Sequence, residues 1–133
     1  MIKVAAAGPA SNFILSFISI FFFILLDKLG LLQNSFHLFF SHFIVINTSL
    51  GLVNLIPIYP LDGGQIFGNI IAKYNSNIFR QLNEYGLKIL VAIIALSIFS
   101  QGRISIIGWL IQKPAILIIS VFQQISQLLL LFL

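Results

Sequence analysis

The stretch Asn54-Leu55-Ile56-Pro57-Ile58-Tyr59-Pro60-Leu61-Asp62-Gly63-Gly64 places one carboxylate between two long apolar segments. Its two prolines and its glycine pair disfavour a regular helix, because proline lacks an amide donor and glycine is conformationally permissive. A charged side chain at the centre of a membrane helix costs about 2.5 kcal/mol or more, so it usually has a partner and a function. The sequence therefore predicts a broken segment at 54–64, with Asp62 as its candidate functional group.

The composition around this stretch is typical of a membrane protein. Of the 133 residues, 59% are hydrophobic and 8% are charged, and the mean hydropathy is +1.10. A soluble domain of this size would leave roughly 30% of its unfolded-chain surface facing water, and this chain is too apolar for that. We therefore predict an all-α, polytopic integral membrane protein with about four transmembrane helices in one membrane domain, 1–133. We expect it to lie in the lipid bilayer of the cell membrane.

Four apolar segments are candidates for the membrane spans. A short apolar stretch before the last of them is either re-entrant or joined to it through a kink at Lys113-Pro114. The region between the second and third spans is more polar, which predicts an interfacial or amphipathic connection. The predicted spans are 10–26, 36–56, 85–99 and 115–133, the short stretch is 104–111, and the connection is 65–83.

The charges and the absence of cysteine exclude several kinds of site. The net charge of +4 comes from seven scattered lysines and arginines that form no run, so the sequence predicts no nucleic-acid partner. Without cysteine the chain has no disulfide and no thiolate metal site. On residue chemistry alone, Asp62 has two interpretations. Its carboxylate either caps the helix that begins near Gln65, or it binds a metal or handles a proton inside a membrane cavity.

Three motifs in this sequence resemble those of site-2 proteases, the membrane-embedded zinc metalloproteases. The pattern Asn54-x-x-Pro57-x-x-Pro60-Leu61-Asp62-Gly63-Gly64 resembles the Asn-Pro-x-Pro-type, Leu-Asp-Gly motif of that family. The upstream stretch Ala6-Ala7-Gly8-Pro9-Ala10-Ser11-Asn12 is similar to the Ala-Gly-Pro-x-x-Asn that opens a core helix. A softer match, Gln81-Leu82-Asn83-Glu84-Tyr85-Gly86, resembles the stretch that leads into the following helix. The resemblance covers nearly the whole chain from about Lys3 onward.

This resemblance implies roles for two polar side chains. Asp62 would be the third protein ligand of a catalytic zinc, whose other ligands are two histidines of a His-Glu-x-x-His helix. Asn54 would contact the substrate or the developing oxyanion. For Asn47, packing between helices is the alternative to such a role. The implied activity is proteolysis of membrane-spanning proteins, so the implied cofactor is zinc and the implied partner is a transmembrane protein substrate.

The sequence contains no His-Glu-x-x-His. Its two histidines, His37 and His42, are five residues apart, about 140° around a helix, whereas paired ligands favour i and i+4 on one face. Its one glutamate is Glu84. The chain thus holds one zinc ligand of three, and we predict the C-terminal portion of a truncated or split protease. Its partner would be the missing N-terminal zinc-binding segment.

Two other functions stay open at this point. A non-catalytic membrane scaffold or pseudoprotease would keep the fold and bind transmembrane helices without cutting them. An unrelated transporter or ion-pathway subunit would use Asp62 to carry a proton or a cation. Against the transporter, the sequence shows no paired broken helices at matching positions of two halves.

Overall fold

The computed structural model describes residues 2–103 and 105–132, apart from the side chain of Asn69. That part of the chain contains helices and no strands. The helices are α1 (Ile2–Lys28), α2 (Asn34–Asn54), α3 (Asp62–Tyr74), α4 (Ser76–Phe99) and α5 (Ile106–Leu129). Among these described helices, all except α3 are long and apolar enough to cross a membrane. The prediction of an all-α, polytopic membrane protein is confirmed.

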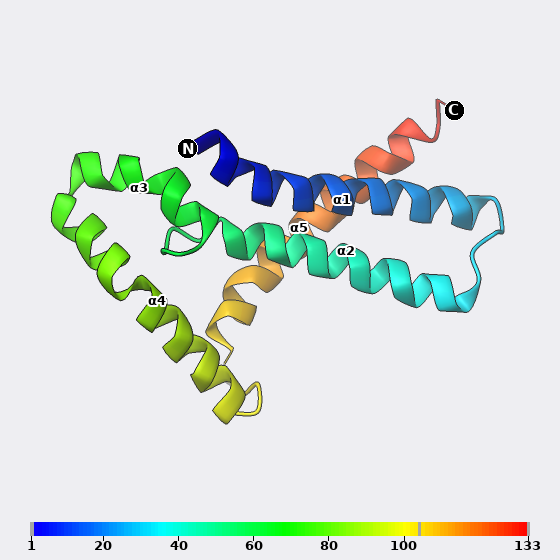
Figure 1. Cartoon of the computed structure of the whole chain (residues 1–133). Coiled ribbons are helices and arrows are strands. Elements are labelled where there is room, and N and C mark those ends of the chain that lie inside the picture. The colour runs from blue at the N-terminus through cyan, green and yellow to red at the C-terminus, as the bar shows by residue number, and fades with distance from the viewer. Residues whose placement is uncertain (1, 104, 133) are drawn as a thin grey trace.

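The helices form a hairpin, a crossing helix and an outlying arm (Figure 1). α1 and α2 are antiparallel neighbours, and α5 packs on both of them. α3 packs on α1, and α4 then runs away from the hairpin, packing mainly on α3. Only 6% of the most apolar window of α4 is buried. Lipid or another protein must therefore cover α4.

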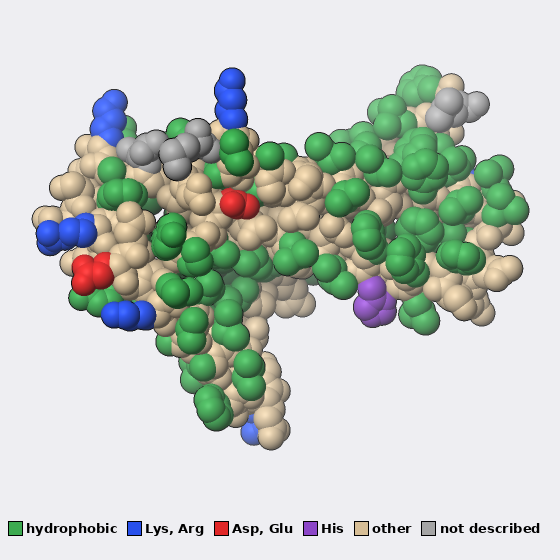
Figure 2. Space-filling view, in the orientation of Figure 1, with side chains coloured by type: hydrophobic (Ala, Val, Ile, Leu, Met, Phe, Trp, Pro, Cys, Tyr) green, Lys and Arg blue, Asp and Glu red, His purple; other side chains and the backbone are tan. Residues whose placement is uncertain are grey.

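The surface supports this placement in a membrane. Apolar side chains cover much of the face seen in Figure 2, whereas most of the charged side chains on this face gather at one end. That end is formed by α3 and the first turns of α4, where Lys73, Arg80, Glu84 and Lys88 are all exposed. Charged and amphipathic segments favour the membrane boundary over its hydrocarbon core.

Small residues hold α1 and α2 together. Ser16 Oγ and Thr48 Oγ1 lie 2.7 Å apart, and both side chains are completely buried. A Cβ on Gly51 would lie 2.8 Å from the ring of Phe13, so only glycine lets that ring rest on α2. Close packing and interhelical hydrogen bonds of this kind drive helix association in lipid. Because Asn54 follows Gly51 by one turn, the same contacts fix the end of α2 from which the chain leaves toward Asp62.

Thr48→Val tests the hydrogen bond between these helices. Valine keeps the shape of threonine but leaves Ser16 Oγ with only the carbonyl of Ile44, 3.4 Å away. We expect a loss of about 1 kcal/mol in the free energy of unfolding, measured by titrating the chain from mild detergent into dodecyl sulfate. Ser16→Ala should then cost less in the valine background than in wild type. If the losses in unfolding free energy of Thr48→Val and Ser16→Ala are additive in the double variant, the two hydroxyls are not coupled.

α1 begins earlier than predicted, at Ile2 and not near Ala10. The three alanines at 5–7 are strong helix formers, and they extend the helix upstream of Pro9. Pro9 therefore lies inside α1 and is buried there, not in its first turn. The longer helix matters for the site, because it carries the whole of the Ala6–Asn12 motif as one rigid element.

α4 also begins earlier than predicted, at Ser76 and not at Tyr85. Asn75 is its N-cap, and the Asn75 side chain accepts hydrogen bonds from the amides of Asn77 and Ile78, each at 3.1 Å. Such a cap stabilises a helix start that periodicity alone does not reveal. The predicted connection is therefore the short helix α3 followed by the first turns of α4.

α5 runs from Ile106 to Leu129 without interruption, with Pro114 inside it. The predicted stretch 104–111 and the predicted span 115–133 thus belong to one helix, and the re-entrant alternative is wrong. Ser105 begins the helix, since its Oγ accepts a hydrogen bond from the amide of Gly108 at 3.2 Å. Residues 104 and 133, at the outer limits of these predictions, lie outside the described part.

Candidate functional site

The chain between α2 and α3 is a series of tight turns over residues 55–61. The amide of Ile58 donates to the carbonyl of Ile56 at 2.8 Å, and the amide of Leu61 donates to the carbonyl of Ile58 at 2.9 Å. The amide of Gly64 then donates to the carbonyl of Leu61 at 3.0 Å. These turns satisfy much of their own backbone, which is what irregular chain at membrane depth requires.

Asp62 is the first residue of α3, and its side chain is half-buried. Leu61 occupies the N-cap position, so the interpretation of Asp62 as the cap of a helix starting near Gln65 is wrong. The carboxylate still lies in the first helical turn, where the helix dipole favours a negative charge. Within residues 2–103 and 105–132 it has neither a hydrogen-bond partner nor an ion-pair partner.

The carboxylate of Asp62 lies directly against α1. A Cβ on Gly8 would fall on Asp62 Oδ2 and would be 3.4 Å from Asp62 Cγ. The upstream motif and the Asp62 motif, which resemble the same protease family, therefore meet in space. The sequence indicated Gly8 only as part of a helix start, whereas the structure shows that its missing side chain makes room for the carboxylate.

The glycine pair after Asp62 allows α3 to pack closely on the turns of residues 55–61, the turn segment. A Cβ on Gly63 would collide with the carbonyl group of Leu55. A Cβ on Gly64 would lie 2.8 Å from the backbone nitrogen of Tyr59. Real side chains essentially never approach backbone this closely, so both positions require glycine. The first turn of α3 thus rests on main chain, and this contact orients Asp62.

The asparagines of the predicted site and motifs lie on α1 and α2. Asn54 is the last residue of α2 and is half-buried. Asn12 lies one turn after Gly8 on α1 and is also half-buried. Asn47 is buried, and its Nδ2 donates to the carbonyl of Phe43 at 2.8 Å. Asn47 therefore has the packing arrangement that was the alternative to a site role.

The two prolines of the motif belong to the turns between α2 and α3. Pro57 and Pro60 are both exposed, and the peptide bond before Pro60 is cis. Their contribution is to the course of the main chain, since each ring fixes φ and removes one amide donor from a segment that must not continue the helix.

The two histidines lie in the part of α2 remote from Asp62. At 1.5 Å per residue, His42 is roughly 18 Å along the helix axis from Asn54, and His37 is farther still. His37 Nε2 is instead 3.9 Å from Asp27 Oδ1, near the turn between α1 and α2. No group of three or more metal-binding side chains occurs among the described residues. Because a catalytic zinc needs three protein ligands, these residues do not fit a complete zinc site.

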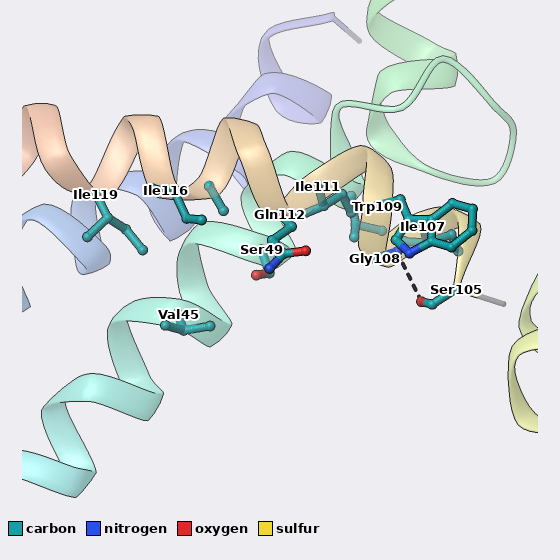
Figure 3. A pocket seen from close by; sticks show the side chains of 12 residues that line it. Val45, Ser49, Ser105, Ile107, Gly108, Trp109, Ile111, Gln112, Ile116 and Ile119 are labelled. Carbon is teal, nitrogen blue, oxygen red and sulfur yellow. Dashed lines mark hydrogen bonds between the residues drawn. The ribbon is translucent and has the colours of Figure 1, made fainter. Parts of the chain in front are cut away.

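A cavity of about 620 Å³ lies between α2 and α5 (Figure 3). Its wall is largely apolar, but Ser49 of α2 and Gln112 of α5 both line it, and Trp109 lies toward the end where Ser105 begins α5. Asp62 does not line this cavity. It is therefore separate from the candidate metal ligand, and it lies between two of the candidate membrane spans.

A smaller and more polar cleft, of about 380 Å³, lies close to Asp62. Two exposed amide side chains, Gln65 and Asn83, line it together with Gly64. The sequence predicted no role for either amide, although Asn83 belongs to the third family motif. Their helical spacing from motif residues could have identified them. Gln65 follows Asp62 by one turn, and Asn83 precedes Gly86 of the third motif by one turn.

Comparison with known proteins identifies the family of the chain. Residues 28–97, more than half of the chain, match the model of peptidase family M50. The chain is 34% identical over 90 residues to a Bacillus subtilis (strain 168) protein named "Putative zinc metalloprotease YwhC". That alignment covers 64% of this chain and 41% of the relative, so the chain spans less than half of the relative's length. No solved structure matches the chain. The family match includes Asp62, and the chain therefore belongs to peptidase family M50, the family of site-2 proteases.

Proposed function

We propose that this chain is the part of an intramembrane zinc metalloprotease that supplies Asp62 as one zinc ligand. Two histidines and a general-base glutamate would come from a His-Glu-x-x-His segment that this sequence does not contain. The substrates would be membrane-spanning proteins, and the location would be the cell membrane. By itself, the chain would not be catalytically complete.

One observation carries this proposal. Asp62 is a half-buried carboxylate with no partner among the described residues, and Gly8 of the second family motif makes room for it. An acid in so apolar a chain is costly unless a cation or a proton compensates it. A metal ion completed by ligands from another segment would supply that compensation. The chain's own contribution is to hold the carboxylate in place through the glycine contacts on both sides of it.

Asn54 supports the same function from the end of α2. It immediately precedes the turn segment, so its amide is carried by the element that leads into Asp62. An amide at such a position can hydrogen-bond a substrate main chain or a developing oxyanion. We propose this role for Asn54, and we propose no such role for Asn47, whose amide already bonds within α2.

The test is to measure zinc and proteolysis with and without the missing segment. The purified chain should hold well below one equivalent of zinc and should not cleave a transmembrane reporter peptide. When it is co-expressed with a membrane segment carrying His-Glu-x-x-His, the complex should hold one zinc and cleave the reporter. Stoichiometric zinc in the chain alone, lost on changing both His37 and His42 to alanine, would overturn the proposal.

The same experiment separates the protease from a non-catalytic scaffold. The incomplete donor set among the described residues is the observation that favours a scaffold, because it also fits a chain that retains the fold without chemistry. A complex that binds the reporter peptide but acquires neither zinc nor cleavage would support the scaffold. A complex that cleaves would exclude it.

A further inference from the structure

The cleft lined by Gln65 and Asn83 is large enough to hold a short peptide segment. Its volume of about 380 Å³ lies in the range of ligand pockets, about 300–1,000 Å³. We propose that it binds the main chain of an extended peptide segment through the carboxamides of Gln65 and Asn83. This inference rests on the proposed function, since it names a subsite for the substrate that Asp62 would serve.

One stripe of α4 forms a wall of the cleft. Phe79, Asn83 and Gly86 recur at i, i+4 and i+7, so they share one helical face. A Cβ on Gly68 would lie 2.9 Å from the ring of Phe79, and a Cβ on Gly86 would lie 2.6 Å from the carbonyl oxygen of Tyr59. These two contacts dock α4 on α3 and on the turn segment. Asn83 lies between them and is thereby held at the cleft.

α3 forms the facing wall. Gly64 and Gly68 are one turn apart and both line the cleft, so that α3 presents backbone there in place of bulky side chains. Among the described residues that line the cleft, Gln65 is the one from α3 with a polar side chain. It lies one turn after Asp62, on the same side of the helix. Asp62 does not line the cleft itself, but the cleft begins one helical turn away from it, at Gln65.

The chemistry of the cleft favours an uncharged main chain as its occupant. A carboxamide both donates and accepts hydrogen bonds, which matches the alternating N–H and C=O groups of an extended peptide. Among the described side chains and backbone, Gln65 and Asn83 have no hydrogen-bond partner, and both carboxamides are exposed. None of the described lining residues is charged, so they offer an uncharged main chain hydrogen bonds and offer an anion no ion pair.

The experiment measures peptide binding to the whole chain in phosphatidylcholine nanodiscs. The probe is a short, uncharged, fluorescent peptide of alternating serine and valine, and fluorescence anisotropy gives its affinity. Gln65→Met combined with Asn83→Leu should weaken binding about tenfold, the effect of losing two neutral hydrogen bonds. Gln81→Met is the matched control, since Gln81 is an exposed amide on α4 that does not line the cleft.

A second probe tests recognition of the main chain directly. The same peptide with N-methylated amides should bind the wild-type chain about tenfold more weakly, and the double variant should bind both peptides alike. Equal binding by the wild type and the double variant, or displacement of the peptide by free phosphocholine, would overturn the inference. The assay needs neither zinc nor cleavage. If the complex cleaves the reporter but its peptide affinity is the same with and without the two carboxamides, only this inference is contradicted. If peptide affinity depends on the two carboxamides but the complex never acquires zinc, only the proposed function is contradicted.

Discussion

Asp62→Ala should abolish zinc binding and proteolysis in the complex of this chain with a His-Glu-x-x-His segment. Loss of a side chain that merely supports a metal ligand costs about 10- to 100-fold in affinity or activity. Loss of a ligand itself should exceed that range, so we expect at least about a hundredfold fall in the cleavage rate. The helical content should stay unchanged, because the Asp62 carboxylate makes no hydrogen bond or ion pair within the described chain.

Asp27→Ala is the matched control for this variant. It removes the same kind of carboxylate from an exposed position near the end of α1, where Asp27 Oδ1 lies 3.9 Å from His37 Nε2. Metal analysis gives zinc per complex, and a transmembrane reporter gives the cleavage rate. We expect Asp27→Ala to match the wild type in both. Zinc retained at full stoichiometry in Asp62→Ala would remove Asp62 from the ligand set.

Gly8→Val should also lower zinc binding and cleavage, by less than Asp62→Ala does, although Gly8 carries no functional group. The new Cβ would fall on the carboxylate oxygen of Asp62 and force it away from α1. Overpacking of this kind costs about 1–3 kcal/mol. Valine gains only a few tenths of a kcal/mol over glycine in helix propensity, so the clash dominates. We expect the cleavage rate and the zinc affinity to fall about tenfold or more.

Ala7→Val provides the control for the glycine variant. Ala7 is exposed and adjacent on the same helix, so the same side chain is added without meeting Asp62. Zinc content, cleavage rate and helical content are compared for both variants. Wild-type zinc and cleavage in Gly8→Val would show that the carboxylate reaches its position without the space that glycine provides.

The fold class followed from local properties of the sequence. The apolar segments predicted the membrane spans, and Pro57, Pro60 and the glycine pair predicted the break before α3. The helix starts were less predictable. α4 begins at Ser76 because Asn75 caps it, and a single hydrogen-bonding side chain leaves little trace in hydrophobic periodicity.

The candidate site divides in a similar way. The residue types alone identified Asp62 as an unusual carboxylate in an apolar chain. They also showed that this sequence contains no His-Glu-x-x-His. Both are properties of short stretches of sequence. Tertiary structure decided that Gly8 makes room for that carboxylate, and that Gln65 and Asn83 line one cleft beside it. These residues are far apart in the chain. They meet because close packing at Gly64, Gly68 and Gly86 determines how α3 and α4 pack on each other and on the turn segment. No local sequence pattern encodes this packing.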